Sequence, residues 1–279
     1  MTPFSALTDR GKARRLRYVA LAALAQYDVE IAQLELVGLF TNALFRLRTP
    51  SGASYAVRLC APAWRTDTDI LSEIMWLEAL AQEPKIAAPV PVRARHGEAF
   101  VSVAADNVPG PNRCVVMSWL PGTPLGRQLS EANLAKMGAL FARLHTHGAA
   151  FVPPEGFTTR RMTSYIARDE PDLLFEGGAI STGTARAQEI LRRTRDAVAR
   201  AFADLYADPA GLCVIHNDLW HDNIKIYGGR LQPLDFEDTI WGYPVQDIAM
   251  ALQDLMTDVA PDHFEPYVNA FRHGYERLL

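Results

Sequence analysis

The spacing of apolar residues divides the chain into a strand-rich first part and a helix-rich second part. Residues 5–27 carry apolar side chains three and four positions apart, which predicts a leading helix. Residues 67–80 show the same period and predict a second helix. Short apolar runs separated by turn residues predict strands at 34–40, 43–49 and 54–60, and further short strands around 92, 100–103 and 114–119. The first part should therefore be a small antiparallel sheet crossed by one helix.

The second part is predicted to be mostly helical. Ser130 can cap a helix whose apolar positions continue to His147, and His145 and His147 then fall at its end. A further helix is expected at about 184–206, after the irregular stretch 151–183 with its many Pro and Gly residues. Between residues 213 and 238 the pattern changes to short strands: 213–215 and 224–227 bracket a loop, and a Gly-Gly turn leads into 230–234.

Composition agrees with an ordinary globular chain of two lobes. The 279 residues are 49% hydrophobic and 22% charged, which is enough for two separate cores. The formal net charge of −4 argues against nucleic acid as the main partner, and no apolar run reaches the roughly 18 residues needed to span a bilayer, so no membrane partner is expected. The first residues do not have the pattern of a secretory signal, so a cytoplasmic location is expected. The three cysteines stand in apolar contexts and are predicted to be buried thiols.

Chemically useful side chains cluster in the segment 213–238. His216, Asp218, Asn223 and Asp235 follow one another within one strand-loop-strand-turn unit. Phosphoryl transfer through a loose transition state requires mainly that the acceptor be positioned and that metal ions be held against phosphate oxygens. Asp218 can orient the acceptor hydroxyl and take its proton, while Asn223 and Asp235 offer the oxygen ligands that Mg²⁺ prefers.

The order and spacing of these residues resemble a known signature. His216-x-Asp218-x-x-x-x-Asn223, followed twelve residues later by Asp235-Phe236-x-Asp238, is similar to the motif of the aminoglycoside phosphotransferase, choline kinase and homoserine kinase family. The resemblance implies an α+β, bilobal, protein-kinase-like fold with a small antiparallel-sheet N-lobe and a mostly helical C-lobe. It places the nucleotide-binding lobe at 1–117, the hinge at 118–122 and the catalytic and substrate lobe at 123–279. It also implies ATP and Mg²⁺ as cofactors and a small-molecule hydroxyl as acceptor.

The resemblance implies particular roles in the N-lobe. The turn 38–42 has a single glycine, so its backbone amides and the side chains of Thr41 and Asn42 are expected near the phosphates. Arg58 stands where the family has a basic residue on the third strand, and Glu73 is its expected partner. An exposed ion pair of little energetic value is the simpler interpretation of these two residues.

The remaining roles concern the hinge and the support of the catalytic loop. The carbonyl of Ser118 and the amide of Leu120 are expected at the adenine edge, although an ordinary edge strand would have the same sequence. His216 should anchor the catalytic loop, with Asp238 and Asp247 supporting it from behind. Weaker candidates for contacts with the acceptor are Tyr165, Arg168, Asp169 and Glu170, and Trp220 could reshape the mouth of the pocket.

Several alternatives stay open at this point. His221-Asp222, with His145 or His147 and Asp247, could belong to a metal phosphohydrolase. The single-glycine turn and Arg58 could belong to a nucleotide-binding pseudokinase. A protein Ser/Thr kinase of the stress-response type fits the same motifs, and so do homoserine-, choline-, sugar- and aminoglycoside-like acceptors. The preference between ATP and GTP, the oligomeric state, and the meaning of the chain end at Leu279, either an open acceptor site or a shortened chain, are also open.

Overall fold

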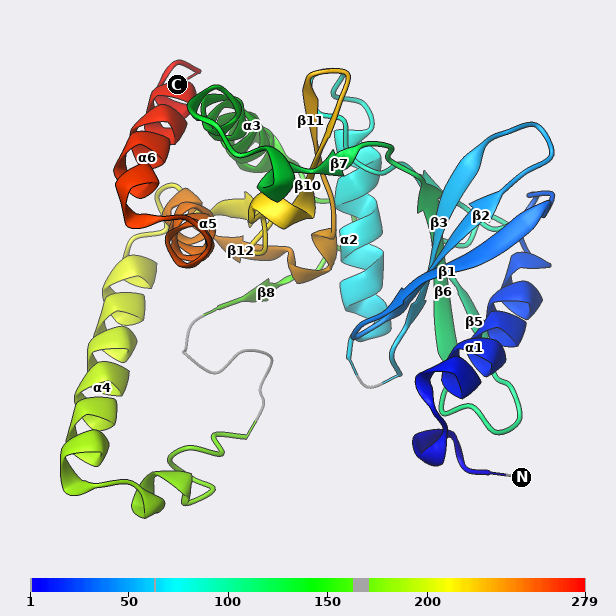
Figure 1. The fold of residues 1–279 in the computed structure, drawn as a ribbon, viewed down its shortest axis with the longest axis horizontal. Coiled ribbons are helices and arrows are strands. Elements are labelled where there is room, and N and C mark those ends of the chain that lie inside the picture. Colours follow the sequence, from blue (N-terminus) through cyan, green and yellow to red (C-terminus); the bar gives the residue numbers. More distant parts are fainter. Residues whose placement is uncertain (1, 63, 163–170, 279) are drawn as a thin grey trace.

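An antiparallel sheet forms the first lobe of the computed structural model, which describes residues 2–62, 64–162 and 171–278 (Figure 1). The strands are β1 (Gln33–Leu39), β2 (Ala43–Arg48), β3 (Ser54–Cys60), β4 (Pro91–Val92), β5 (Val101–Val103) and β6 (Asn112–Ser118). They pair in the order β1-β2-β3-β6-β4, and β5 also pairs with β6. The predicted strands of the first part are therefore confirmed.

Two helices flank this sheet. α1 (Asp9–Leu24) buries Val19, Ala20, Ala23 and Leu24. It is shorter than the predicted 5–27, because a short 3-10 helix occupies Phe4–Ala6 and the extended residue Thr8 caps α1 by accepting a hydrogen bond from the Gly11 amide. α2 (Asp67–Leu80) has the predicted bounds and begins with a capping box between Thr66 and Asp69.

α2 lies between the two lobes and contributes to a hydrophobic core on each side (Figure 1). Ile70 and Ile74 pack with Val115 and Met117 of β6. Trp76 and Leu77, farther along the helix, belong instead to the core of the second lobe. A movement of α2 would therefore disturb both cores, and the helix fixes Glu73 relative to each lobe.

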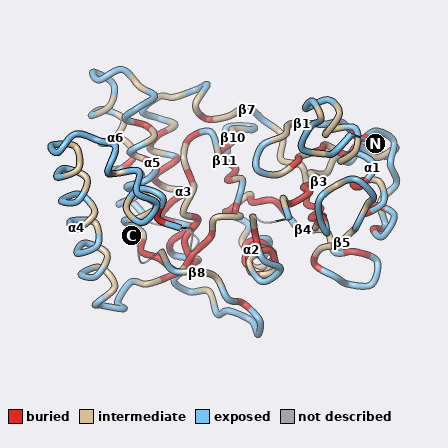
Figure 2. The backbone as a smooth tube through the Cα atoms, turned by 90° about the horizontal axis from the view of Figure 1, so that it is seen from below, coloured by how far each residue is buried: buried red, intermediate tan, exposed pale blue. Residues whose placement is uncertain are grey.

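The second lobe combines helices with two small sheets. Its helices are α3 (Glu131–Ala150), α4 (Ala185–Ala207), α5 (Pro244–Asp258) and α6 (Pro261–Glu276). One sheet has the order β11 (Arg230–Pro233), β10 (Ile224–Tyr227), β7 (Thr123–Pro124), and the other β8 (Arg160–Arg161), β12 (Ile240–Gly242), β9 (Cys213–Ile215). α3 and α6 approach closely at two glycines. Gly138 of α3 faces the backbone of α6, Gly274 of α6 faces the backbone of α3, and at each position a side chain would overlap a main-chain carbonyl. α4 buries none of its residues fully and lies along the outside of the lobe (Figure 2).

The pairing of the segment 213–238 adds one feature that the pattern did not predict. β10 and β11 form the expected hairpin through Gly228 and Gly229, whose φ angles of 56° and 76° favour glycine. β9, however, pairs with β12 rather than with β10. The loop between β9 and β10 therefore connects the two small sheets of the second lobe.

Two further expectations concern the cysteines and membrane spans. Cys60, Cys114 and Cys213 are buried and free, as predicted. Among the residues that the structure describes, no helix has the length and apolar character needed to cross a bilayer.

Candidate active site

The loop between β9 and β10 is fixed through its backbone and through His216. Asp247, in the first turn of α5 and 1% exposed, accepts hydrogen bonds from the backbone amides of His216 and Asn217. The His216 ring lies 2.8 Å from the Leu234 carbonyl through Nε2, and its Nδ1 accepts from the Asp218 amide. Because a carbonyl can only accept, Nε2 carries the proton and the ring is neutral. His216 thereby connects the loop to the end of β11, next to Asp235.

His145 extends this support, in a way that the sequence analysis missed. It was expected at the end of a helix, but α3 continues to Ala150 and His145 is buried within it. Its Nε2 lies 3.1 Å from Asp247 Oδ2, and its Nδ1 lies 2.9 Å from the Tyr275 hydroxyl on α6. The spacing of His145 from Leu134 and Phe141 puts all three on the buried face of α3, which could have revealed this position.

His147 and His216 make the stability of the fold sensitive to acid. Burial lowers the pKa of both imidazoles, and the Trp76 indole donates to His147 Nδ1 at 3.2 Å, a contact that needs neutral histidine. Below an ordinary histidine pKa of about 6.5 the unfolded chain binds more protons than the folded chain. These two histidines should therefore lower the free energy of unfolding as the pH drops from about 7 through 6, while the raised pKa values of Asp218 and Asp235 act in the opposite direction.

Urea unfolding measured between pH 7.5 and 5.5 tests this prediction. On acidification the free energy of unfolding of His147→Gln should rise relative to that of the wild type, since the glutamine amide oxygen still accepts from Trp76 but does not titrate. His96→Gln, at an exposed position, serves as the control and should behave as the wild type. Equal changes in the wild type and His147→Gln would contradict this account of His147.

Asp218 lies in the loop that His216 and Asp247 hold. The Asn223 side-chain amide donates to both the Asp218 carbonyl and its Oδ2, each at 2.8 Å. Burial, followed by the nearby carboxylates of Asp238 and Asp235, raises the pKa of Asp218 to about 7. Asp218 is thus oriented by Asn223 and can gain or lose a proton near neutral pH.

Asp235 follows β11 at a sharp change of chain direction. Its φ of 58° is left-handed, a conformation that Asp adopts more readily than bulkier residues. The next residue, Phe236, is buried against the rings of His216 and Trp76, with ring centroids 4.5 Å and 5.4 Å away. Burial and the neighbouring Glu237 carboxylate raise the pKa of Asp235 to about 7. The packing of Phe236 thus holds Asp235 at the start of the short 3-10 helix 236–238.

The donor set around Asp235 fits a hard divalent cation. Both hydrogen bonds of the Asn223 side chain use Nδ2, which leaves its carbonyl oxygen for another partner. Asp235 supplies a carboxylate in the same cavity wall. The Asp235 carboxylate contributes to the raised pKa of Asp218, and a bound Mg²⁺ would relieve this repulsion. Asn223 and Asp235 are therefore the residues suited to hold it.

Arg58 and Glu73 form the expected pair, and the pair is buried. Arg58 NH1 lies 2.9 Å from Glu73 Oε1, NH2 contacts Oε2, and the two side chains are only 8% and 3% exposed. Burial opposes the charge of Arg58, but the Glu73 carboxylate outweighs it and raises the pKa of the guanidinium above its ordinary value. The interpretation as an exposed ion pair is therefore wrong.

Removal of Glu73 should strongly destabilise the fold. Glu73→Ala leaves the Arg58 guanidinium buried beside an empty space, a change that typically costs about 3–5 kcal/mol. Glu78 on the same helix offers a matched control, because it makes the same two-point contact with the exposed Arg93 at 2.8 Å. Glu78→Ala should cost no more than about 1 kcal/mol by denaturant unfolding. Equal losses for the two variants would contradict the distinction.

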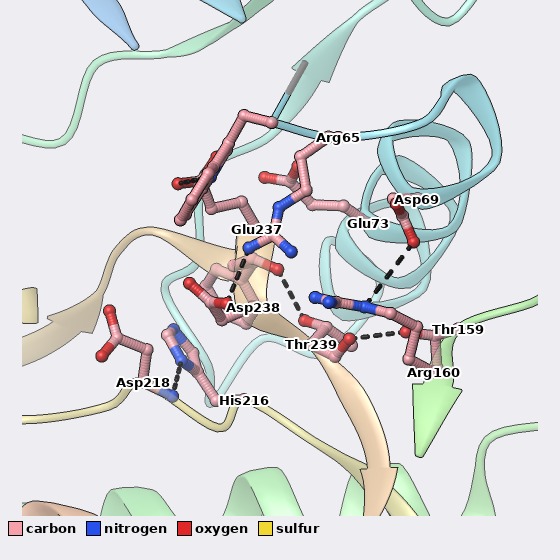
Figure 3. A network of polar contacts seen from close by, with 12 residues as sticks. Arg65, Asp69, Glu73, Thr159, Arg160, His216, Asp218, Glu237, Asp238 and Thr239 are labelled. Carbon is pink, nitrogen blue, oxygen red and sulfur yellow. Dashed lines mark hydrogen bonds and ion pairs between the residues drawn. The ribbon is translucent and has the colours of Figure 1, made fainter. Parts of the chain in front are cut away.

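Glu237 and Asp238, which come after Asp235, connect this turn to the first lobe. Asn42 Nδ2 donates to Glu237 Oε2 at 2.7 Å, and Trp64 Nε1 lies 3.3 Å from Oε1. The Arg65 guanidinium, 2% exposed, lies 2.6 Å from Asp238 (Figure 3). The sequence analysis named Asn42 but for a different role, and it missed Glu237 and Trp64, to which only the acids around Phe236 could have pointed.

The predicted nucleotide residues meet at a cavity of about 400 Å³ between the two lobes. It is lined by Thr41, Asn42, Arg58, Ser118, Leu120, Asn223 and Asp235. The Asn42 side chain is already occupied, because its oxygen accepts from the Ala61 amide while its nitrogen donates to Glu237. The Ser118 hydroxyl accepts from the Val90 amide. The cavity also contains Lys225 and Glu237, which the sequence analysis did not include.

Other candidates do not join this site. Tyr165, Arg168, Asp169 and Glu170 lie outside the described residues. Trp220 is partly buried, with its ring 5.2 Å from that of His221.

The histidines of the phosphohydrolase alternative have separate partners. His221 contacts Asp258 at 3.0 Å, His145 contacts Asp247, and His147 contacts Trp76. Within the described ranges no group of three or more His, Cys, Asp or Glu is placed to hold a metal ion. The described residues therefore do not form the metal centre that this alternative requires.

Comparisons with known proteins agree with this geometry. Two homoserine kinases are similar in sequence: that of Nitrobacter winogradskyi is 28% identical over 225 residues, 80% of this chain, and that of Azorhizobium caulinodans is 31% identical over 176 residues, 63% of this chain. The chain spans only 62% and 46% of these two relatives.

Solved structures share the fold. The amicoumacin kinase hAmiN, in complex with AMP-PNP, Ca²⁺ and Ami, has a TM-score of 0.78 at 19% identity, covering 97% of this chain and 80% of that protein. The microcompartment-associated aminopropanol kinase has a TM-score of 0.73 at 23% identity, covering 95% and 81%. The fold is therefore α+β and protein-kinase-like, as predicted. The model of the phosphotransferase enzyme family matches residues 33–279, and the chain belongs to that family.

Proposed function

We propose that this protein is an ATP- and Mg²⁺-dependent kinase that transfers the γ-phosphoryl group to a hydroxyl of a small molecule. The observation that carries the proposal is the cavity between the lobes, which Asn223, Asp235 and Arg58 line together, with Arg58 held by the buried Glu73. Asp218 is attached to the same cavity wall through Asn223. Family membership supports the same reaction.

Asp218 is the proposed base. The acceptor oxygen forms a new bond to the γ-phosphorus while the bond from that phosphorus to the ADP oxygen breaks, and the hydroxyl proton passes to the Asp218 carboxylate. A base works best when its pKa lies near the working pH, and burial with neighbouring carboxylates raises the pKa of Asp218 to about 7. Asn223 holds the carboxylate in one orientation at 2.8 Å.

The other residues position the nucleotide. Arg58, held by Glu73, presents positive charge to the phosphates, and Thr41 and the backbone of the turn 38–42 cover them. Bound Mg²⁺ would neutralise phosphate charge, with Asn223 and Asp235 as its protein ligands. The Ser118 carbonyl and the Leu120 amide face the adenine ring of the nucleotide. This assignment divides the chain into a nucleotide lobe at 1–117, a hinge at 118–122 and a catalytic lobe at 123–279.

The acceptor is proposed to be a small hydroxylated molecule, with homoserine as the first candidate because of the two similar homoserine kinases. ADP release should be measured with ATP and Mg²⁺ against homoserine, 1-amino-2-propanol, choline, aminoglycosides and a Ser/Thr peptide. One acceptor is expected to raise ADP release well above the rate without acceptor. Stimulation by the peptide alone would reject the small-molecule acceptor. Stimulation by no compound, together with no binding of Mg²⁺-ATP, would reject the kinase.

A further inference from the structure

Lys225 extends from β10 into the cavity proposed to hold the nucleotide. It lines the cavity together with Ser118 and Leu120, and its Nζ donates to the Leu120 carbonyl at 3.0 Å. The ammonium also lies 4.5 Å from the centroid of the Trp119 ring. Lys225 belongs to the second lobe and contacts Leu120 and Trp119, in the segment that connects the two lobes.

The position of Lys225 follows from the strand period. Side chains alternate between the two faces of a strand, so Lys225 lies on the face opposite the fully buried Ile224, and Asn223 ends the short 3-10 helix that directly precedes the strand. Asn223 and Lys225 both line the cavity. Asn223 stands beside Asp235 at the phosphate end, and Lys225 stands at the Leu120 end. A nucleotide that reaches from Leu120 to Asp235 must therefore pass its nucleoside over Lys225.

The charge of Lys225 is poorly balanced by the described residues. None of the ion pairs among them includes Lys225. Arg46 lies over the same Trp119 ring at 4.7 Å, so two cations share one aromatic side chain. Burial and the Arg46 charge lower the pKa of Lys225. An ammonium has three hydrogens to donate, and the Leu120 carbonyl is its one acceptor within the described structure.

A purely structural role explains these observations less well. A residue that only supports the Leu120 carbonyl needs a single hydrogen-bond donor. A neutral side chain would supply that donor without placing a desolvated charge beside Arg46. The half-buried ammonium is better explained if a bound molecule brings oxygen acceptors into the cavity. The phosphates of the nucleotide lie at the Asp235 end, so these acceptors belong to the nucleoside.

We propose that Lys225 is a nucleotide-binding residue whose ammonium donates to a ribose hydroxyl of the nucleoside. The inference rests on the proposed function, since it requires a nucleotide in this cavity. It makes Lys225 a residue that discriminates between nucleotides, in contrast to the main-chain contacts of Ser118 and Leu120.

Displacement of a fluorescent nucleotide tests the proposal. Affinities for ATP, 2′-deoxy-ATP, 3′-deoxy-ATP and GTP should be measured with the wild type, Lys225→Met and Lys136→Met. Methionine keeps the aliphatic chain over Trp119 and removes the ammonium. Lys136 is the matched control, because it also donates to a backbone carbonyl, that of Gly229 at 3.2 Å, but on an exposed surface outside this cavity.

The expected result is a loss of discrimination. With a ribose contact, the wild type binds one deoxy analogue more weakly than ATP, by on the order of tenfold, as for a hydrogen bond to a charged group. Lys225→Met should weaken the preferred nucleotide and bind the preferred and disfavoured nucleotides alike. Lys136→Met should retain the wild-type affinities.

Three results would overturn the proposal. The first is equal affinity of the wild type for ATP and both deoxy analogues, which needs no variant and so does not depend on how Lys225→Met folds. The second is an unchanged set of affinities in Lys225→Met. The third is an equal loss for all four nucleotides, which is the result of a structural role at Leu120. If the wild type binds none of the four, the proposed function itself fails, which is a distinct outcome.

Discussion

Asp218→Asn is expected to lower kcat by about 10²–10⁴-fold, the typical contribution of a positioned general base. Asparagine has nearly the shape of aspartate, and its oxygen can still accept from the Asn223 amide that now lies 2.8 Å from Asp218 Oδ2. An amide, however, cannot take the proton of the acceptor hydroxyl. The affinity for ATP should change little, because Asp218 is not among the residues that line the nucleotide cavity.

The measurement is a pair of experiments on the same preparation. ADP release gives kcat, and a nucleotide titration gives the affinity. Asp204→Asn, on the exposed helix α4, controls for the loss of a carboxylate elsewhere and should keep the wild-type kcat. Wild-type turnover in Asp218→Asn would reject Asp218 as the base, whereas loss of both turnover and nucleotide binding would point to a structural role.

Asp235→Asn should remove the effect of Mg²⁺ on nucleotide binding. Asparagine tolerates the left-handed conformation at this position, where φ is 58°, so the turn should be retained. Its neutral amide oxygen holds a hard cation less tightly than the Asp235 carboxylate does. We expect the affinity for Mg²⁺-ATP to fall by at least about 10–100-fold, the loss seen when even an outer partner of a metal ligand is removed.

Calorimetric titration of ATP with and without Mg²⁺ separates the metal from the fold. Asp235→Asn should bind metal-free ATP at least as well as the wild type, since a carboxylate near the phosphates is gone. Asp262→Asn, at an exposed site near the start of α6, is the control. If Mg²⁺ raises the ATP affinity of Asp235→Asn as much as that of the wild type, Asp235 is not the metal ligand.

The sequence pattern predicted those elements of the structure whose formation depends on residues close together in the chain. The apolar period of residues 67–80 located α2, and the Gly228-Gly229 turn located the β10–β11 hairpin, so both were found from sequence. The resemblance paired Arg58 with Glu73, but only the structure shows that the pair is buried and makes a two-point contact. The order of Asp218, Asn223 and Asp235 pointed to a common site because a loop and a hairpin return the chain to the same place.

The features that were missed depend on contacts between residues distant in sequence. His145 meets Asp247 across 102 positions, and Asn42 meets Glu237 across 195. No period or local spacing encodes these partners. β9 pairs with β12, a strand distant in sequence. A three-residue apolar run such as β9 carries no information about which strand it will pair with.

The most direct test of the account is phosphorus NMR of ATP, Mg²⁺ and the acceptor with the best ADP release, with wild-type protein and with Asp218→Asn. The account predicts that the wild type converts the γ-phosphate signal into that of a phosphate ester of the acceptor, and that Asp218→Asn forms this ester at a rate lower by about 10²–10⁴-fold. Formation of inorganic phosphate without any ester, or equal ester formation by the two proteins, would contradict it.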